Sequence, residues 1–325
     1  MREVTFTEAA REALSDAMAA DPSVFVVGEG VGERGGNFNT TTGLYERYGP
    51  MRVCDTPICE RGFIGLCTGA AMAGARPVVD FMFIDFILDG FGEMVNQIAK
   101  MQYMSSGRLS MPVVLRGCVG IGGAAATHHS GNYYPVFAHL PGFRVALPAT
   151  PYDAKGLFKT ALEGDDPVLF LEHKSILNHR GPVPENPYAV PFGQAEVRRE
   201  GGDITVVALA NMIPLTWKLC EELAGDGISV ELIDPRTVAP LDMDTILESV
   251  HKTGRLLIVD EAFGPCGIGA EIAAQVQSLA FDDLDAPVGR LNGAHVPTPY
   301  SAPLEAACLP QPESISQAIR DLMEE

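Results

Sequence analysis

The sequence predicts an α/β fold with two domains, in which helices cover both faces of a parallel sheet. The chain has 325 residues, and a domain averages about 150 residues, so the length predicts two domains. Short apolar runs alternate with helical patterns in two separate blocks, which is typical of parallel sheets with helical crossovers. We expect the first domain at residues 1–180, a linker at 181–203 and the second domain at 204–325.

The first block alternates strand-like runs with helical patterns. Runs of β-branched and apolar residues predict the strands Val24–Val27, Arg52–Cys54, Pro77–Phe81, Val113–Leu115, Arg144–Leu147 and Val168–Leu171. Helical spacing predicts the helices Glu8–Ala20, Gly62–Ala75, Asp85–Ser105 and Tyr152–Glu163. A capping box of Thr5 and Glu8 opens the first helix, while Thr150 and Pro151 supply a cap and a first-turn proline for the last.

A polar stretch with prolines at positions 182, 184, 187 and 191 separates the blocks and predicts the linker. The second block repeats the alternation. Its expected strands are Ile204–Leu209, Ser229–Ile233, Leu256–Val259 and Val288–Leu291. Its expected helices are Pro214–Ala224, Asp242–His251, Gly267–Ala280 and Ser314–Glu324.

Composition excludes several classes of protein. The net charge of -19 argues against a nucleic-acid partner, which would require a basic surface. Seven scattered cysteines without a Cys-x-x-Cys pair indicate reduced thiols. The first residues form neither an apolar signal core nor a transit pattern, and aspartates interrupt the most apolar stretch, 77–92. We therefore expect a cytoplasmic protein without a membrane partner.

Three glycine-rich motifs suggest phosphate binding. Gly30–Gly35 fits G-x-G-x-x-G, and Asp55 follows at the spacing of a nicotinamide site, so an NAD-dependent dehydrogenase is an alternative. However, the residues after Gly35 form a turn-and-cap run that cannot open a helix. Gly120–Ala125 is a second match without an acidic partner. Gly225-Asp-Gly227 resembles the start of a magnesium-diphosphate motif, but its place between a helix and a strand indicates a helix cap.

Glu60 and two histidines are the residues most suited to chemistry. Glu60 follows a short strand, and His128 and His129 follow the loop after the strand that ends at Leu115. Because ligands bind at the carboxyl ends of parallel strands, we expect Glu60 and His129 to reach one site. The alternatives are simply hydrogen-bonded side chains, or a metal site formed by His128, His129 and His139, for which no carboxylate lies at ligand spacing.

Motifs spread over the whole chain resemble, in the right order, the beta subunit of thiamine-diphosphate-dependent 2-oxo-acid dehydrogenases. These proteins form the first component of the pyruvate, branched-chain and acetoin complexes. The matching motifs are Gly28-Glu-Gly30, Asp55-Thr-Pro-Ile-Cys-Glu-Arg-Gly-Phe63, Gly69–Pro77, Asn96–Lys100, His129-Ser130, His139-Leu-Pro-Gly142, Pro148–Gly156 and Asp234–Asp242. The resemblance implies a pyrimidine-binding domain followed by a transketolase-type C-terminal domain.

The resemblance also implies roles for individual residues. Glu60 is expected to hydrogen-bond a ring nitrogen of the aminopyrimidine and so promote loss of a proton from the thiazolium carbon. Ile58, Phe86 and Asp89 match further contacts to the cofactor, although relatives can carry glutamine in place of Asp89. His129 is expected to orient or protonate intermediates and to assist acyl transfer to a lipoyl arm. His128 is expected to contact the residues that form the site and not the cofactor itself.

Metal ions are implied in two ways. Some relatives hold potassium through backbone carbonyls, and the matching positions are Val113, Ala161, Leu162, Gly164 and Asp166. Because the chain lacks a magnesium-diphosphate motif, we expect it to bind only the pyrimidine half of the cofactor and to supply no Mg²⁺ ligand.

The missing motif implies a partner. An alpha subunit would bring Mg²⁺ and the diphosphate half, in an α2β2 heterotetramer, and a lipoyl acyltransferase core protein would dock on the C-terminal domain. The substrate is a 2-oxo acid such as pyruvate, or acetoin. Other interpretations are the C-terminal subunit of a split transketolase and a non-catalytic interaction subunit. Arg61 stands where relatives carry an apolar or small residue, and the sequence gives it no role.

Overall fold

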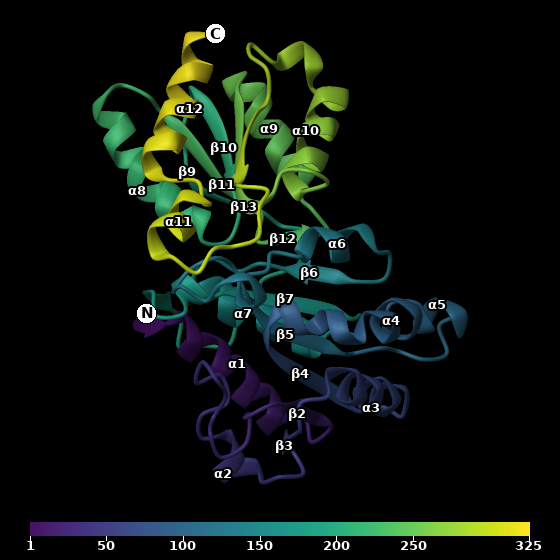
Figure 1. Ribbon diagram of the computed structural model, residues 1–325. Helices are drawn as coiled ribbons and strands as arrows, with labels where there is room; N and C mark the ends of the chain where they lie inside the picture. The colour runs from purple at the N-terminus through teal and green to yellow at the C-terminus, as the bar shows by residue number, and fades with distance from the viewer. The chain divides into compact units, whose positions relative to one another are not determined.

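The computed structural model describes residues 1–325, which form two compact units. Unit 1 contains Met1–Val119 and Val136–Phe192. Unit 2 contains Gly120–Pro135 and Gly193–Glu325. Each unit has its own sheet with helices packed against it, as Figure 1 shows. The division differs from the sequence order, because a segment between two strands of unit 1 packs as part of unit 2.

The main sheet of unit 1 has the strand order β6-β7-β5-β4-β2-β3, and all of these pairings are parallel. A separate antiparallel pair joins β1 to β8. The strands are β1 (Arg2–Thr5), β2 (Val24–Gly28), β3 (Val53–Asp55), β4 (Arg76–Phe83), β5 (Val114–Val119), β6 (Arg144–Ala146), β7 (Val168–His173) and β8 (Arg180–Val183). Every residue of β5 and β7 is buried, as expected for strands covered on both faces.

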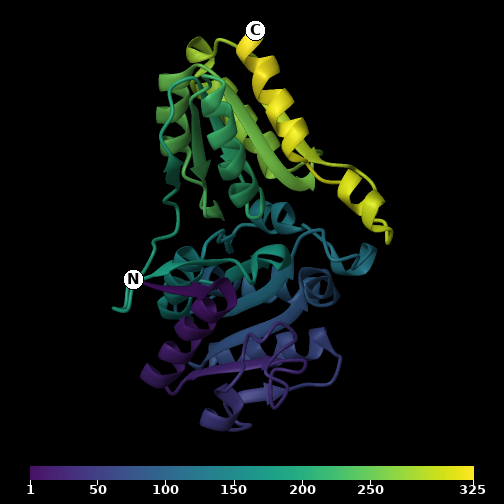
Figure 2. The same ribbon diagram turned by 90° about the vertical axis from the view of Figure 1, so that its left-hand side faces the viewer.

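Helices cover both faces of this sheet. On one face α1 and α7 lie side by side, and on the other α3 packs on β4 and η1 (Figures 1 and 2). The expected caps are present, since Thr5 and Glu8 form the capping box of α1 and Thr150 accepts from the Asp153 amide at α7. The helices are α1 (Phe6–Ala20), α2 (Leu44–Tyr48), α3 (Glu60–Met72), η1 (Ile84–Gly90), α4 (Phe91–Glu93), η2 (Met94–Ile98), α5 (Met101–Met104), α6 (Tyr134–His139), α7 (Pro151–Glu163) and η4 (Lys174–Ile176).

The expected continuous helix Asp85–Ser105 is wrong. The segment forms a 3-10 helix, a short α-helix, a π-helix and a second short α-helix. Packing explains part of the change, because a Cβ added to Gly90 would lie 2.1 Å from the Ile64 side chain on α3. A side chain at position 90 would force Ile64 to move, and the glycine that avoids this contact disfavours a regular helix.

A buried ion pair connects two central strands of unit 1. The Arg116 guanidinium on β5 donates to both carboxylate oxygens of Glu172 on β7, at 2.6 and 2.9 Å. Both side chains are almost fully buried, at 2% and 1% exposure. On the neighbouring strand β4, Asp80 accepts a hydrogen bond from the Thr40 hydroxyl at 2.9 Å. This network fixes the loop after β2 to the carboxyl ends of the sheet.

The sheet of unit 2 has the strand order β14-β13-β10-β11-β9, in which only the β9–β11 pair is antiparallel. Helices α8 and α12 lie on one face, and α9 and α10 on the other (Figure 1). The strands are β9 (Glu196–Arg199), β10 (Ile204–Ala208), β11 (Val230–Asp234), β12 (Thr237–Ala239), β13 (Leu256–Phe263) and β14 (Gly289–Gly293). The helices are η3 (Thr127–His129), α8 (Met212–Gly225), α9 (Met243–Thr253), α10 (Ile268–Leu279), η5 (Phe281–Asp283), α11 (Ala302–Ala307) and α12 (Pro312–Glu324).

The stretch expected to be a linker is more structured than its composition predicts. Strand β8 pairs with β1 at its start, and β9 joins the sheet of unit 2 near its end. The Gly225-Asp-Gly227 motif caps the end of α8, and Gly227 has a φ of 86°, so the cap interpretation is confirmed. No helix combines the length and the apolar character that crossing a membrane requires.

Removing one charge of the buried pair should destabilise unit 1 strongly. We expect Glu172→Gln to lower the free energy of unfolding by about 3–5 kcal/mol, because Arg116 would keep an uncompensated buried charge. The matched control is Glu163→Gln, which breaks an exposed pair with Lys159 and should cost less than about 0.5 kcal/mol. Urea denaturation followed by circular dichroism measures both, and equal small losses would contradict the prediction.

Candidate active site

Glu60 lies at the first position of α3, where the chain turns from the end of β3 into the helix. The residue is 9% exposed, although neighbouring Cys59 and Arg61 are exposed. A helix N-terminus favours a negative charge, and no side chain caps this one. The helix begins two residues earlier than the sequence predicts, so Glu60 belongs to the helix and does not merely precede it.

Glu29 is a second carboxylate at this edge, and no role for it was expected from the sequence. It follows β2, the neighbour of β3, and the Thr56 amide donates to the Gly28 carbonyl at 3.0 Å. Burial raises the pKa of Glu29, and the nearby charge of Glu60 raises it further. One carboxylate oxygen of Glu29 and the Thr56 hydroxyl are buried without a hydrogen-bond partner. The site thus contains polar atoms that a ligand could satisfy. Its place directly after a parallel strand is the signal that could have identified Glu29.

The other expected cofactor contacts have different surroundings. Phe86 is half-buried, and its ring contacts Phe83 edge to face, with ring centres 6.1 Å apart. Ile58 is 82% exposed, so this apolar side chain projects from unit 1. Asp89 is exposed. Glu60, Ile58, Phe86 and Asp89 all belong to unit 1, and their roles toward a cofactor stay predictions.

Arg61 has a partner that the sequence did not suggest. Its guanidinium forms an ion pair with Glu93 at 2.8 Å. This hydrogen bond raises the pKa of Arg61, and the charges of Glu93 and Asp89 raise it further. The pair connects the first turn of α3 to α4 across exposed surface. Asp89 therefore contributes to the charge environment of Arg61.

Three of the five carbonyls expected to hold potassium already accept hydrogen bonds from this chain. The Val113 carbonyl accepts the Val168 amide at 3.0 Å. The Arg76 guanidinium donates to the carbonyls of Leu162, at 3.1 Å, and of Gly164. A cationic side chain thus occupies one side of the carbonyl cluster, which does not fit a second cation there. The potassium site stays a prediction.

The histidine loop, defined as Gly120–Pro135, carries His128 and His129 within unit 2. His128 is exposed and His129 is half-buried, in the short helix η3. Directly after them the Tyr134 hydroxyl donates to Asp260 on β13. Burial raises the pKa of Asp260 to about 6, although its hydrogen bonds from Tyr134 and the Ala262 amide act against this rise. Glu60 belongs to unit 1 and His129 to unit 2, and the expectation that both reach one site stays a prediction.

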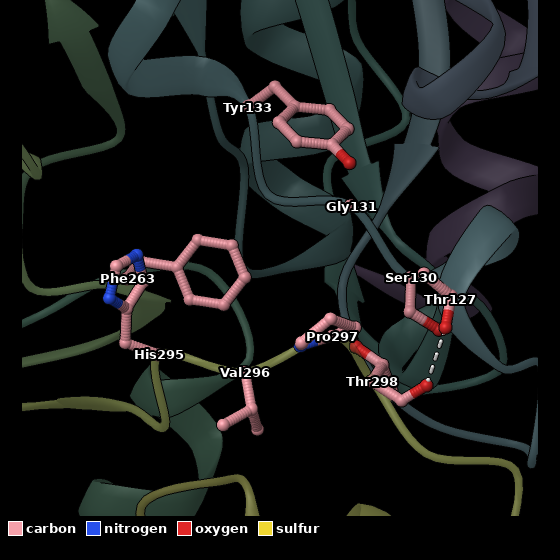
Figure 3. Close-up of a pocket in the computed structure, with 9 residues that line it drawn as sticks. All are labelled: Thr127, Ser130, Gly131, Tyr133, Phe263, His295, Val296, Pro297 and Thr298. Atoms are coloured by element: carbon pink, nitrogen blue, oxygen red, sulfur yellow. Dashed lines mark hydrogen bonds between the residues drawn. The ribbon is translucent and has the colours of Figure 1, made fainter.

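A pocket of about 290 Å³ lies beside the histidine loop (Figure 3). Phe263 ends β13 and His295 follows β14, so both lie at the carboxyl ends of neighbouring parallel strands. Their rings meet edge to face, with centres 5.4 Å apart. The wall of loop residues is fixed by the Thr127 hydroxyl, which donates to the Thr298 carbonyl at 2.9 Å. The remaining lining residues are Ser130, Gly131, Tyr133, Val296 and Pro297.

The structure contains no group of three or more His, Cys, Asp and Glu side chains that could hold a metal ion. His128 and His129 lie in unit 2 and His139 in unit 1, so the alternative of a three-histidine metal site finds no support.

Comparisons with known proteins agree with this arrangement. Residues 2–180 match the transketolase pyrimidine-binding domain, and residues 193–315 match the transketolase C-terminal domain. The pyruvate dehydrogenase E1 beta subunit of Rickettsia felis is 44% identical, over 98% of each chain. The beta subunit of acetoin:2,6-dichlorophenolindophenol oxidoreductase from Cupriavidus necator is 42% identical, over 99% of this chain and 98% of its own.

The chain belongs to the E1 beta-subunit family. Within this family the expected resemblance and the expected two-domain α/β fold are both confirmed. A solved split-gene transketolase, an inactive beta4 tetramer, has a TM-score of 0.80 and 22% identity, and covers 99% of this chain and 98% of its own. At that identity the similarity concerns the fold alone.

Family membership decides against the nicotinamide alternative, and the structure gives the reason. Gly30, Gly35 and Gly36 all have positive φ, and the first helix after β2 does not begin until Leu44. The loop therefore lacks the helix N-terminus on which a dinucleotide-binding fingerprint places the pyrophosphate. An E1 beta chain instead requires a site for an aminopyrimidine, and Glu60, Glu29 and Phe86 offer two carboxylates and an aromatic ring that fit such a group.

The buried carboxyl of Asp260 should make unit 2 less stable as the pH rises. Its pKa of about 6 exceeds the value of 3.8 for an exposed carboxyl, so the folded protein retains a proton that the unfolded chain has lost. Between pH 5 and 7 this group should lower the free energy of unfolding by about 1 kcal/mol. Denaturation of the wild type and of Asp260→Asn at both pH values measures the difference, and identical pH dependences would contradict the prediction.

Proposed function

We propose that this chain is the beta subunit of a thiamine-diphosphate-dependent dehydrogenase that acts with an alpha subunit in an α2β2 heterotetramer. The decisive observation is the identity of 42–44% to pyruvate and acetoin dehydrogenase beta subunits over nearly the whole chain. The reaction is the oxidative decarboxylation of a 2-oxo acid, or the cleavage of acetoin, with acyl transfer to a lipoyl group. Relatives of both kinds match equally well, so the choice of substrate stays open.

Glu60 is the residue that holds the pyrimidine in this proposal. When bound, thiamine diphosphate supplies a carbon nucleophile and an electron sink for the substrate carbonyl. The Glu60 carboxylate hydrogen-bonds a ring nitrogen of the aminopyrimidine and exchanges a proton with it. Glu29 keeps a proton to higher pH than an ordinary glutamate, so it can supply the second hydrogen bond or proton at this edge. Phe86 would pack on the ring, and Ile58 and Asp89 would contact the cofactor at the margin of the site.

The outward face of α3 suits a partner chain. Four exposed residues lie at helical spacing on one face of α3, namely Gly62, Gly65, Leu66 and Gly69. No atom lies within 4 Å of a Cβ added to Gly65 or Gly69. Leu66 is 59% exposed. Small residues let the backbone of another chain approach closely. The exposed apolar residues beside them would then be buried away from water. The helix that presents this face has Glu60 at its first position, so an alpha subunit bound here could bring Mg²⁺ and the diphosphate half toward the same end of the helix.

His129 acts in the later half of the reaction. Its imidazole is suited to supply a proton to one sulfur of the lipoyl disulfide, which is reduced as the other sulfur takes up the acyl group. His128, exposed beside it, supports the loop. The lipoyl arm belongs to an acyltransferase core protein, which we place against the C-terminal domain. The cytoplasmic location expected from the sequence stays a prediction.

Glu60→Gln should abolish turnover of the co-expressed alpha–beta complex and leave assembly intact. Glutamine keeps the shape and one acceptor oxygen, but it cannot exchange a proton with the ring. Steady-state assays with pyruvate, other 2-oxo acids and acetoin measure the loss, and size-exclusion chromatography reports assembly. Glu163→Gln, exposed on α7, is the control and should retain wild-type activity. Near-normal turnover of Glu60→Gln would refute its assigned role.

The beta chain alone should show no decarboxylation with thiamine diphosphate and Mg²⁺. This expectation follows from the absence of a diphosphate motif and of a metal-binding cluster in the chain. Release of CO₂ from labelled 2-oxo acids measures the activity, and addition of the alpha chain should restore it. Robust turnover by the purified beta chain would overturn the proposal that two subunits share the cofactor.

A further inference from the structure

The backbone of the histidine loop is strained along the stretch that leads to His129. Ala124 and Ala126 have φ of 51° and 60°, in the left-handed region that side chains other than glycine adopt only where surrounding contacts impose it. Gly120, Gly122 and Gly123 also have positive φ. A loop of this kind does not hold one conformation by itself, so its contacts decide where His129 lies.

One carboxylate holds both ends of this loop. The amide of Ile121 and the side-chain amide of Asn132 both donate to the same oxygen of Glu261, the latter at 3.1 Å. Glu261 lies on β13 and is 3% exposed. The Gly120 amide donates to the Gly131 carbonyl at 3.1 Å and closes the loop between these points. His129 lies within the closed segment.

A second carboxylate holds the middle of the loop. The Ala124 amide, at one of the strained positions, donates to Glu305 on α11 at 3.0 Å. Glu305 is 6% exposed, and its other oxygen is buried without a partner. Hydrogen bonds from backbone amides to an ionised carboxylate are shorter and stronger than neutral ones, most of all where water is excluded. A buried carboxylate destabilises the fold unless donors satisfy it, and the Ala124 amide is such a donor for Glu305.

We propose that Glu261 and Glu305 are positioning residues, which hold the histidine loop and thereby set the place of His129 for acyl transfer. The inference rests on the role of His129 in the proposed function. It assigns part of the catalytic arrangement to the C-terminal domain. Neither glutamate touches the reacting atoms in this proposal, since both act through the loop.

Hydrogen exchange on the assembled alpha–beta complex tests the anchoring without reference to activity. Loop amides at 120–132 should exchange about tenfold faster or more in Glu261→Ala and in Glu305→Ala, because each variant removes an acceptor. The rest of unit 2 should be unchanged. The corresponding glutamine variants keep one acceptor oxygen and should restore part of the protection. Glu222→Ala, exposed on α8, is the matched control.

The exchange result decides between two outcomes. Faster exchange confined to the loop supports the anchoring, and partial rescue by glutamine assigns it to the acceptor oxygen. Unchanged loop exchange in both alanine variants would overturn the inference. Because Glu261 and Glu305 lie on different elements, a folding failure of one variant leaves the other to decide.

A double-mutant cycle then tests whether the anchors act through His129. Each alanine variant should slow acyl transfer to a lipoyl group about 10- to 100-fold, with KM for the 2-oxo acid unchanged, because small displacements of a catalytic group have effects of this size. Combined with His129→Ala, neither should slow transfer further than His129→Ala alone. Additive losses would overturn the positioning role.

The two proposals fail in different ways. An acyl-transfer rate in His129→Ala equal to that of the wild type would refute the proposed role of His129. The loop exchange rates would still decide the anchoring by Glu261 and Glu305, since they do not depend on turnover.

Discussion

The ion pair between Arg116 and Glu172 is the interaction on which the arrangement of unit 1 depends. It lies near the carboxyl ends of two adjacent parallel strands, the edge at which the loops that form a site must begin. Two buried charges are tolerated there because the bidentate geometry satisfies both groups, and Asp80 beside them accepts from Thr40 of the loop after β2. A loop tied to the sheet in this way delivers Glu29 to the end of β2, next to Glu60 at the start of α3.

In unit 2, buried carboxylates at the end of a strand accept hydrogen bonds from a backbone amide and from a tyrosine hydroxyl. Asp260 and Glu261 are consecutive residues near the end of β13, and their side chains bind Tyr134 and Ile121, at the two ends of the histidine loop. Because the end of β13 carries two buried acids, each must accept hydrogen bonds, and a glycine-rich and strained loop supplies donors to both. The same hydrogen bonds therefore satisfy the buried carboxylates and hold the strained loop in place.

The sequence predicted the fold class and most helices and strands because their signals are local. The Thr5–Glu8 capping box, the apolar strands and the proline at Pro151 each act within a few residues, and each is where the structure has it. The broken helix after Asp85 was missed because a helix contact at Gly90 overrides local preference. Arg61 found no role in the sequence because its partner, Glu93, lies 32 positions away. At the site, the resemblance singled out Glu60 and His129. Glu29 could be recognised only once the structure showed that β2 and β3 are neighbours.

The histidine loop shows most clearly why sequence order is a poor guide to a site. It lies within the region that matches the pyrimidine-binding domain, yet its contacts assign it to unit 2. Its anchors, Glu261 and Glu305, follow Ile121 and Ala124 by 140 and 181 positions. No periodicity or motif spans such distances. A chain that ended at Phe192 would retain His129 but lose both anchoring carboxylates, and Ala124 and Ala126 would then be free to leave the left-handed region. The carboxylates of the C-terminal domain are therefore needed for the shape of a loop that lies, in sequence, within the pyrimidine-binding region.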